Sequence, residues 1–305
     1  GDVYKRQGLG NDIIDGGEGD DSLDGGDGSD SVLGGAGHDI LNGGAGNDTL
    51  AGGAGHDTIN GGAGNDTIDA GTGNDAIVLT NGFGRDLVDG GEDVGNGDID
   101  VLDASSLTEG VIVTYAADIE DGTLTGATSG DQVTFSNIER VIFSAQNDTI
   151  NGGAGNDTID AGTDNDAIVL TNGFGRDLVD GGENVGDIDT LDASSLTEGV
   201  IVTYAADIED GTLTGASSGD QVTFSNIERV IFTAQNDTIN GAAATAALTV
   251  DAGAGDDSVT GGAAADTLVG GLGRDTLNGG AGHDNLTGGD GNDSLNGGAG
   301  NDTLV

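Results

Sequence analysis

Aspartates recur every nine residues along two stretches of this chain, and they are the residues most able to do chemistry. Each is the sixth residue of the pattern Gly-Gly-x-Gly-x-Asp-x-aliphatic-x, as in GGAGNDTLA at 43–51. A carboxylate is a hard oxygen ligand, and glycine-rich turns can direct backbone carbonyls at the same ion. The spacing therefore predicts a series of metal sites that bind through oxygen.

The candidate metal ligands fall into three groups. The regular repeats supply Asp12, Asp21, Asp30, Asp39, Asp48, Asp57, Asp66, Asp75, Asp257, Asp275, Asp284, Asp293 and Asp302. A short return of the pattern between the two stretches adds Asp157 and Asp166. Weaker binding is predicted where insertions or lost glycines alter the turn, at Asp86, Asp148, Asp177, Asp237 and Asp266.

The period also predicts the elements that position these carboxylates. Three residues after each turn form a minimal strand, with an aliphatic residue such as Leu50 facing inward. Two repeats make one coil of 18 residues, so aspartates 18 apart stack. Coils in a parallel stack lie about 4.8 Å apart, and unneutralised carboxylates at that distance repel. A cation between the coils removes the repulsion.

Calcium suits these sites better than other metals. It accepts six to eight oxygen ligands in tolerant geometry, whereas magnesium requires a stricter octahedron and retains its water. The chain has no cysteine and only three histidines, which argues against zinc or copper. The predicted cofactor is therefore Ca2+ at multiple sites.

The composition supports a cation-binding chain. There are 55 acidic residues against 7 basic ones among 305, for a formal net charge of −48. Such a surface repels nucleic acid and anionic membranes, and no apolar run is long enough for a membrane span. One inward aliphatic residue per repeat buries little apolar surface, so folding and metal binding are expected to be one event.

Two near-identical copies of a different sequence interrupt the repeats. In each copy, segments such as GVIVTY, DQVTF and ERVIF predict strands, and the phenylalanines predict small cores. The predicted domains are a β-roll at 8–78, a module at 79–142, a short β-roll at 143–169, a second module at 170–231 and a β-roll at 232–305. Residues 1–7, GDVYKRQ, resemble a translated sequencing adapter and are expected to be a non-native leader on a fragment of a longer protein.

Two other motifs are given plainer interpretations. His38 and His56 are 18 residues apart and could bind a transition metal, but they and His283 occupy a variable position and are interpreted as exposed turn residues. The segment at 215–219 matches Gly-x-Ser-x-Gly, which in serine hydrolases requires a strand, a sharp turn and a helix. No helix is predicted, so no catalytic residue is assigned.

The repeats resemble the RTX, or haemolysin-type, calcium-binding nonapeptide. The resemblance implies an all-β fold, a right-handed parallel β-roll with calcium between stacked turns. It also implies export by a type I secretion apparatus and an extracellular or cell-surface location. The two modules, with LDASSLTEGV and FSNIERVIF, look like segments that interleave with such repeats in secreted proteases.

Two functional hypotheses follow. In the first, the chain is the calcium-binding repeat region of a secreted bacterial protein and folds on calcium after export. In the second, it is the non-catalytic tail of a secreted protease, lipase or haemolysin whose active domain lies outside this fragment. Gene sequence upstream of Gly8 discriminates between them: an HExxH motif or a true serine elbow favours the second, and further repeats or adhesion domains favour the first.

Overall fold

The computed structural model describes residues 3–91, 99–116, 120–182 and 186–305. Within these ranges every regular element is a β-strand and none is a helix, as predicted. The chain divides into two compact units, residues 1–149 and 150–305, and each contains one of the duplicated modules. β16 (Thr149–Asn151) falls at the division.

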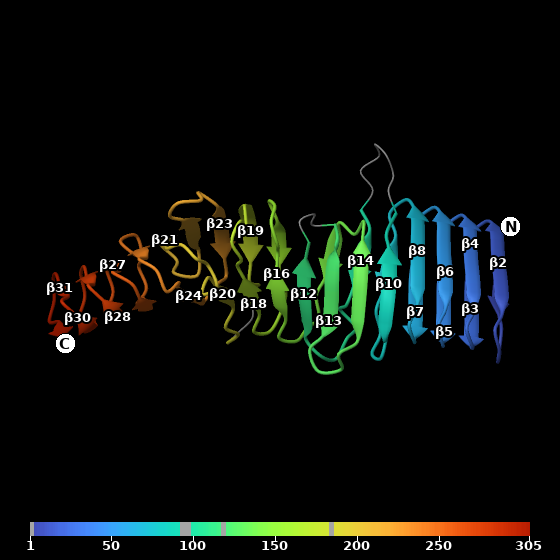
Figure 1. The fold of residues 1–305 in the computed structure, drawn as a ribbon, viewed down its shortest axis with the longest axis horizontal. Coiled ribbons are helices and arrows are strands. Elements are labelled where there is room, and N and C mark those ends of the chain that lie inside the picture. Colours follow the sequence, from blue (N-terminus) through green and yellow to red (C-terminus); the bar gives the residue numbers. More distant parts are fainter. Residues whose placement is uncertain (1–2, 92–98, 117–119, 183–185) are drawn as a thin grey trace. The chain divides into compact units, whose positions relative to one another are not determined.

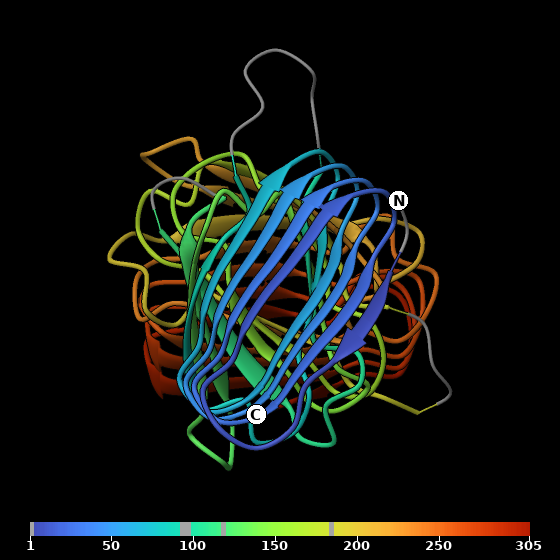
Figure 2. The same ribbon diagram turned by 90° about the vertical axis from the view of Figure 1, so that its right-hand side faces the viewer.

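The first unit is a parallel β-roll with two faces (Figures 1 and 2). One face has the order β1 (Tyr4–Arg6), β3 (Ser22–Asp27), β5 (Ile40–Ala45), β7 (Thr58–Ala63), β9 (Ala76–Val78), β11 (Val101–Asp103), β15 (Arg140–Ile142). The other has β2 (Ile13–Glu18), β4 (Ser31–Ala36), β6 (Thr49–Ala54), β8 (Thr67–Thr72), β10 (Arg85–Asp89), β14 (Gln132–Ser136), β13 (Gly122–Gly126), β12 (Val111–Tyr115).

The register confirms a coil of two repeats. Val32 pairs with Leu50, and Leu50 with Ile68, each 18 residues on. These aliphatic side chains are almost completely buried and form a narrow core between the faces. The predicted three-residue strands are too short for β3 to β8, which have six residues. The residues after the predicted strand, two glycines in β3 to β7 and Ala70-Gly71 in β8, continue the strand, as in the pairing of Gly35 with Gly53.

The module in this unit inserts an antiparallel meander into one face. β12 pairs with β13 and β13 with β14, while β14 pairs in parallel with β10. The strands predicted from GVIVTY, DQVTF and ERVIF are confirmed as β12, β14 and β15, and β13 was not predicted. All six phenylalanines of the chain are buried, as expected for conventional cores in the modules.

The second unit repeats this plan. One face has β17 (Thr158–Asp160), β19 (Arg176–Asp180), β23 (Gln221–Ser225), β22 (Gly211–Gly215), β21 (Val200–Tyr204), β25 (Thr238–Asn240), β27 (Ser258–Thr260), β29 (Thr276–Asn278), β31 (Ser294–Asn296). The other has β18 (Ala167–Val169), β20 (Thr190–Asp192), β24 (Arg229–Ile231), and then a separate sheet of β26 (Thr249–Ala254), β28 (Thr267–Gly273), β30 (Asn285–Gly291), β32 (Thr303–Leu304).

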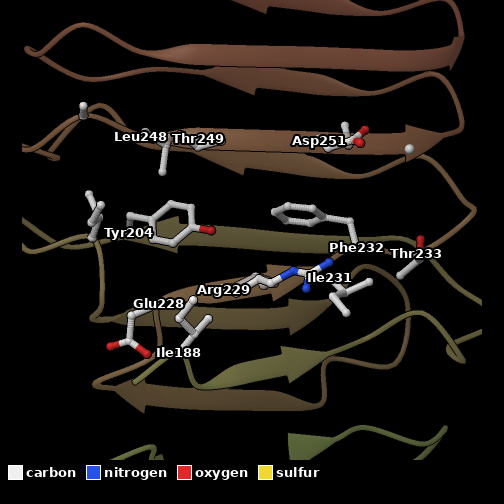
Figure 3. Close-up of a pocket in the computed structure, with 15 residues that line it drawn as sticks. Ile188, Tyr204, Glu228, Arg229, Ile231, Phe232, Thr233, Leu248, Thr249 and Asp251 are labelled. Carbon is white, nitrogen blue, oxygen red and sulfur yellow. The ribbon is translucent and has the colours of Figure 1, made fainter. Parts of the chain in front are cut away.

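A cavity of about 600 Å³ lies where this second face is interrupted (Figure 3). β21 and β22 occupy two positions between β23 and β25, whereas on the opposite face β24 ends one sheet and β26 begins the next. Residues of β24 and β26, together with Tyr204, Phe232 and Leu248, line the space. The cavity is thus a consequence of two strands that have no counterpart across the coil.

Candidate metal centres

The sixth-position aspartates form ladders in which each carboxylate binds the coil before it. Asp48 Oδ1 accepts a hydrogen bond from the Asp30 N–H at 2.7 Å, and Asp66 Oδ1 accepts from the Asp48 N–H at 2.8 Å. The same hydrogen bond is accepted by the carboxylates of Asp30, Asp39, Asp57 and Asp75, and in the last repeats by those of Asp275, Asp284, Asp293 and Asp302. One oxygen of each carboxylate therefore has a structural role that is complete without metal.

The second carboxylate oxygen has no such partner. Oδ2 is buried and accepts no hydrogen bond in Asp21, Asp30, Asp39, Asp48, Asp57, Asp66, Asp157, Asp257, Asp275 and Asp284. The residues themselves are 1–3% exposed. Buried polar atoms in native proteins almost always have a partner, so a column of unpartnered anionic oxygens is suited to bind cations.

Backbone carbonyls converge on these same oxygens beside the first glycine of each repeat. A methyl group on Gly25 would lie 2.5 Å from Asp30 Oδ2 and 2.6 Å from the Gly43 carbonyl oxygen. The same arrangement occurs at Gly52, with Asp57 Oδ2 and the Ala70 carbonyl. Two acceptor oxygens that face the same small space repel unless a cation or a hydrogen-bond donor lies between them. Glycine is required here for space rather than for its dihedral angles.

Burial of these carboxylates alters their acidity. Desolvation is the largest effect and raises the pKa of Asp66 and Asp257 to about 6, and that of Asp86 to about 7. The hydrogen bond from the preceding coil lowers the pKa, and the neighbouring ladder carboxylate raises it again. Without a cation, the folded ladders therefore hold protons more tightly than ordinary aspartates do.

The structure distinguishes among the predicted ligands. Asp12, Asp293 and Asp302, at the ends of the ladders, are only half-buried. Asp157 is buried with neither oxygen hydrogen-bonded. Asp75 and Asp166 lie in the ladders, and their amides donate to the next carboxylate at 2.8 Å.

In three of the five predicted weaker ligands, both carboxylate oxygens accept hydrogen bonds from protein donors. In Asp237, Oδ2 accepts from the Thr233 N–H at 3.0 Å and Oδ1 from the Val200 N–H at 2.7 Å. Asp148 has the equivalent contacts, and Asp266 Oδ2 accepts from the Gly262 N–H at 2.7 Å. Asp86 and Asp177 differ, because both continue the ladder normally despite the insertion before them.

Sequence reasoning missed four further ladder residues, all in the modules. Asp100 Oδ1 accepts from the Asp75 N–H and Asp189 Oδ1 from the Asp166 N–H, each at 2.8 Å. Glu139 and Glu228 then accept from the amides of Asp100 and Asp189, each at 2.6 Å. One sequence pattern could have identified them: an acidic residue two positions before the aliphatic residue of a three-residue strand, as in Asp-Val-Leu-Asp at 100–103.

The histidines and the serine motif have structural roles. His38 and His56 stack with ring centroids 5.0 Å apart and planes 6° apart, so their nitrogens do not converge on one metal. Each Nδ1 accepts a backbone N–H from the next coil at 2.8 Å, and His283 does the same at 2.9 Å. Ser217 lies in the turn between antiparallel strands β22 and β23, where it bonds to Glu198.

The ladders fit calcium. No group of three or more acidic or histidine side chains suited to holding a metal occurs in the part of the chain that the structure describes. The space beside the first glycine of each repeat, here called a cradle, instead combines a single carboxylate with a backbone carbonyl. Calcium accepts such a flexible set of oxygen ligands. The described residues contain no helix long and apolar enough to cross a membrane.

Comparison with known proteins supports the same conclusion. The family model described as RTX calcium-binding nonapeptide repeat (4 copies) matches residues 7–41, 42–77, 144–168, 249–277 and 270–304. Such repeats are typical of secreted bacterial proteins and are non-catalytic. The matched segments carry the regular nonapeptide part of the aspartate ladders. No curated protein matches the chain.

Proposed function

Because this chain belongs to the proteins that carry RTX calcium-binding nonapeptide repeats, we propose that it is the calcium-dependent folding region of a secreted bacterial protein. The observation that carries the proposal is the column of buried, unpartnered Oδ2 atoms beside backbone carbonyls. We assign calcium binding to the ladder aspartates given above and infer that this part of the protein is non-catalytic.

Bound calcium would supply positive charge between oxygens that otherwise repel. The residues of the chain perform the remaining steps. Oδ1 of each aspartate holds the neighbouring coil through its amide, and this fixes Oδ2 toward the carbonyl of the next turn. The first glycine leaves the space that both oxygens need. The inward aliphatic residues then exclude water from the interior of the coil.

Calcium dependence also suits export. Extracellular calcium modules bind at about 10⁻⁴–10⁻³ M, so a cytosol poor in calcium leaves such a chain unfolded, as passage through a type I secretion apparatus requires. Once outside the cell, the chain would meet enough calcium to fold, either free or at the cell surface.

Circular dichroism of the full chain tests this function. We expect a disordered spectrum in chelator at pH 7.5 and a β-rich spectrum as calcium rises toward millimolar, reversed by renewed chelation. Magnesium at the same concentration should have little effect because it fits carbonyl cages poorly. A spectrum that is β-rich in chelator and unchanged by calcium would exclude the proposal.

A further inference from the structure

Both modules place a carboxylate in the ladder outside the segments that match the nonapeptide. Asp189 lies eight residues after Gly181 and Asp100 ten residues after Gly90, whereas each repeat aspartate lies five residues after its first glycine. Both aspartates are fully buried, at 0% exposure. Each contributes Oδ1 to the amide of the preceding ladder residue, as the repeat aspartates do.

The other oxygen of Asp189 lies in an acceptor-lined cradle like those of the repeats. Oδ2 is buried and without a hydrogen-bond partner. A methyl group on Gly181 would lie 2.8 Å from Asp189 Oδ2 and would clash with the Asn226 carbonyl oxygen. In the first copy, a methyl group on Gly90 would lie 2.9 Å from Asp100 Oδ2 and would clash with the Asn137 carbonyl.

The carbonyl that completes each cradle is held in an unusual conformation. Asn226 has φ of 53° and Asn137 has φ of 54°, in the left-handed region that non-glycine residues seldom adopt. Asn226 Nδ2 donates to Asp180 Oδ1 at 2.7 Å, and Asn137 Nδ2 donates to Asp89 Oδ1 at 2.7 Å. These bonds fix the asparagines in the position that the first glycine of the next coil takes in the repeats.

Negative charge accumulates around Asp189 without compensation. Glu228, Asp187 and Asp180 all act on it electrostatically, and Asp187 Oδ2 is a second buried oxygen with no partner. Both ion pairs seen among the described residues lie elsewhere, at Arg6–Asp24 and Arg274–Asp256. A buried, unpaired carboxylate is costly unless a cation or a proton neutralises it.

We propose that each module holds one further calcium site, built on Asp189 and the Asn226 carbonyl in the second copy and on Asp100 and the Asn137 carbonyl in the first. The inference rests on the proposed function, since it extends calcium binding from the repeats into segments that the repeat model does not match. The modules thereby continue the calcium column instead of interrupting it.

Counting bound calcium tests the proposal. Full chain is dialysed to equilibrium against saturating calcium, and the ions per chain are measured by atomic emission. The double variant Asp100→Asn/Asp189→Asn should bind two fewer ions than the natural sequence. The matched control Asp103→Asn/Asp192→Asn changes the carboxylates at the ends of β11 and β20, the strands that directly follow Asp100 and Asp189. These carboxylates accept the amides of Ser105 and Ser194, and the control should bind the full number of ions.

Terbium in place of calcium locates the ions in the unaltered chain, even if the double variant misfolds. Anomalous difference maps of terbium-loaded crystals should show peaks beside Asp100 and Asp189. A chain with terbium or calcium only along the nonapeptide ladders, and an unchanged count in the double variant, overturns this inference alone. A chain that binds no calcium anywhere overturns the proposed function as well.

Discussion

Each ladder aspartate uses its two carboxylate oxygens for different purposes. In Asp48 and the repeat aspartates like it, Oδ1 replaces a backbone carbonyl as the acceptor for the amide of the neighbouring coil, and Oδ2 accepts no hydrogen bond. Under the proposed function, Oδ2 is the oxygen that binds the cation. An asparagine has the same shape and can keep the first role but not the second. The two roles are therefore separable by substitution.

Asp48→Asn should weaken calcium binding while favouring the calcium-free fold. The asparagine side chain has no anionic oxygen, so the calcium concentration at the midpoint of folding should rise about tenfold. This corresponds to a loss of about 1.4 kcal/mol in the free energy of calcium binding. In chelator, the new N–H group can donate to the Gly61 carbonyl where Asp48 Oδ2 lay beside it. Calcium titrations by circular dichroism, with and without chelator, measure both effects. Asp69→Asn, at an exposed position of β8, should change neither.

Gly25→Ala should destabilise the roll although Gly25 does not have a positive φ. The added methyl group would lie 2.5 Å from Asp30 Oδ2, so the carboxylate or the neighbouring turn must move. We expect a loss of about 1–3 kcal/mol in the free energy of unfolding with calcium present. Urea unfolding measures it. Gly8→Ala is the control, since a methyl group there has open space, and equal losses in the two variants would refute the steric argument.

At the scale of elements, the turn before each strand decides which carboxylate enters the ladder. In the repeats the residues joined by the ladder contact are 18 residues apart, and in the modules the separation is 23 or 25 residues without loss of the contact. The meander that the modules add is held by a separate carboxylate. Glu198 Oε2 accepts the amides of Ser217 and Ser218 at 2.6 and 3.0 Å.

Glu198→Ala should loosen the turn between β22 and β23 and leave calcium binding intact. Hydrogen bonds from Ser217 and Ser218 hold the pKa of Glu198 at about 2, so the contact persists above pH 4.5 and weakens only as the pH falls through about 2. Amide hydrogen exchange at pH 7 should become faster at Ser217 and Ser218 in the variant. Unchanged exchange there, or a loss of bound calcium, would contradict this assignment.

At the scale of the whole molecule, negative charge has the strongest influence on folding. The chain carries a formal net charge of −48, and its ladders bury acidic side chains whose pKa values lie above the ordinary value. Calcium and protons are then alternative ways to neutralise the same carboxylates. Folding should respond to both.

In chelator, the chain should fold at low pH and unfold as the pH rises. A carboxyl whose pKa is raised by folding gives stability that is fully present below 3.8 and is lost as the pH rises through about 6 for Asp66 and about 7 for Asp86. With calcium, protons compete, so the half-saturating calcium concentration should increase as the pH falls from 8 to 6. Circular dichroism across pH 3.5–8 checks both, and a chelated chain more ordered at pH 8 than at pH 4 would refute the linkage.

The nine-residue period by itself determined the roll, the inward aliphatic column and the aspartate ladders. It could do so because each repeat carries its own turn glycines, its carboxylate and its one buried residue. Stacking identical units leaves a single register. Leu50 and Asp48 therefore lie where their places in the period predict.

Only the tertiary structure decided what the modules contribute. The spacing between Asp189 and the glycines before it differs from that of the repeats. The carbonyl beside Asp189 comes from Asn226, which follows β23 after the β21–β22 hairpin. No local pattern relates these residues, because their approach depends on how the meander returns the chain to the ladder. Three-dimensional packing decides whether a buried carboxylate oxygen meets a hydrogen-bond donor, as in Asp237, or has none, as in Asp189.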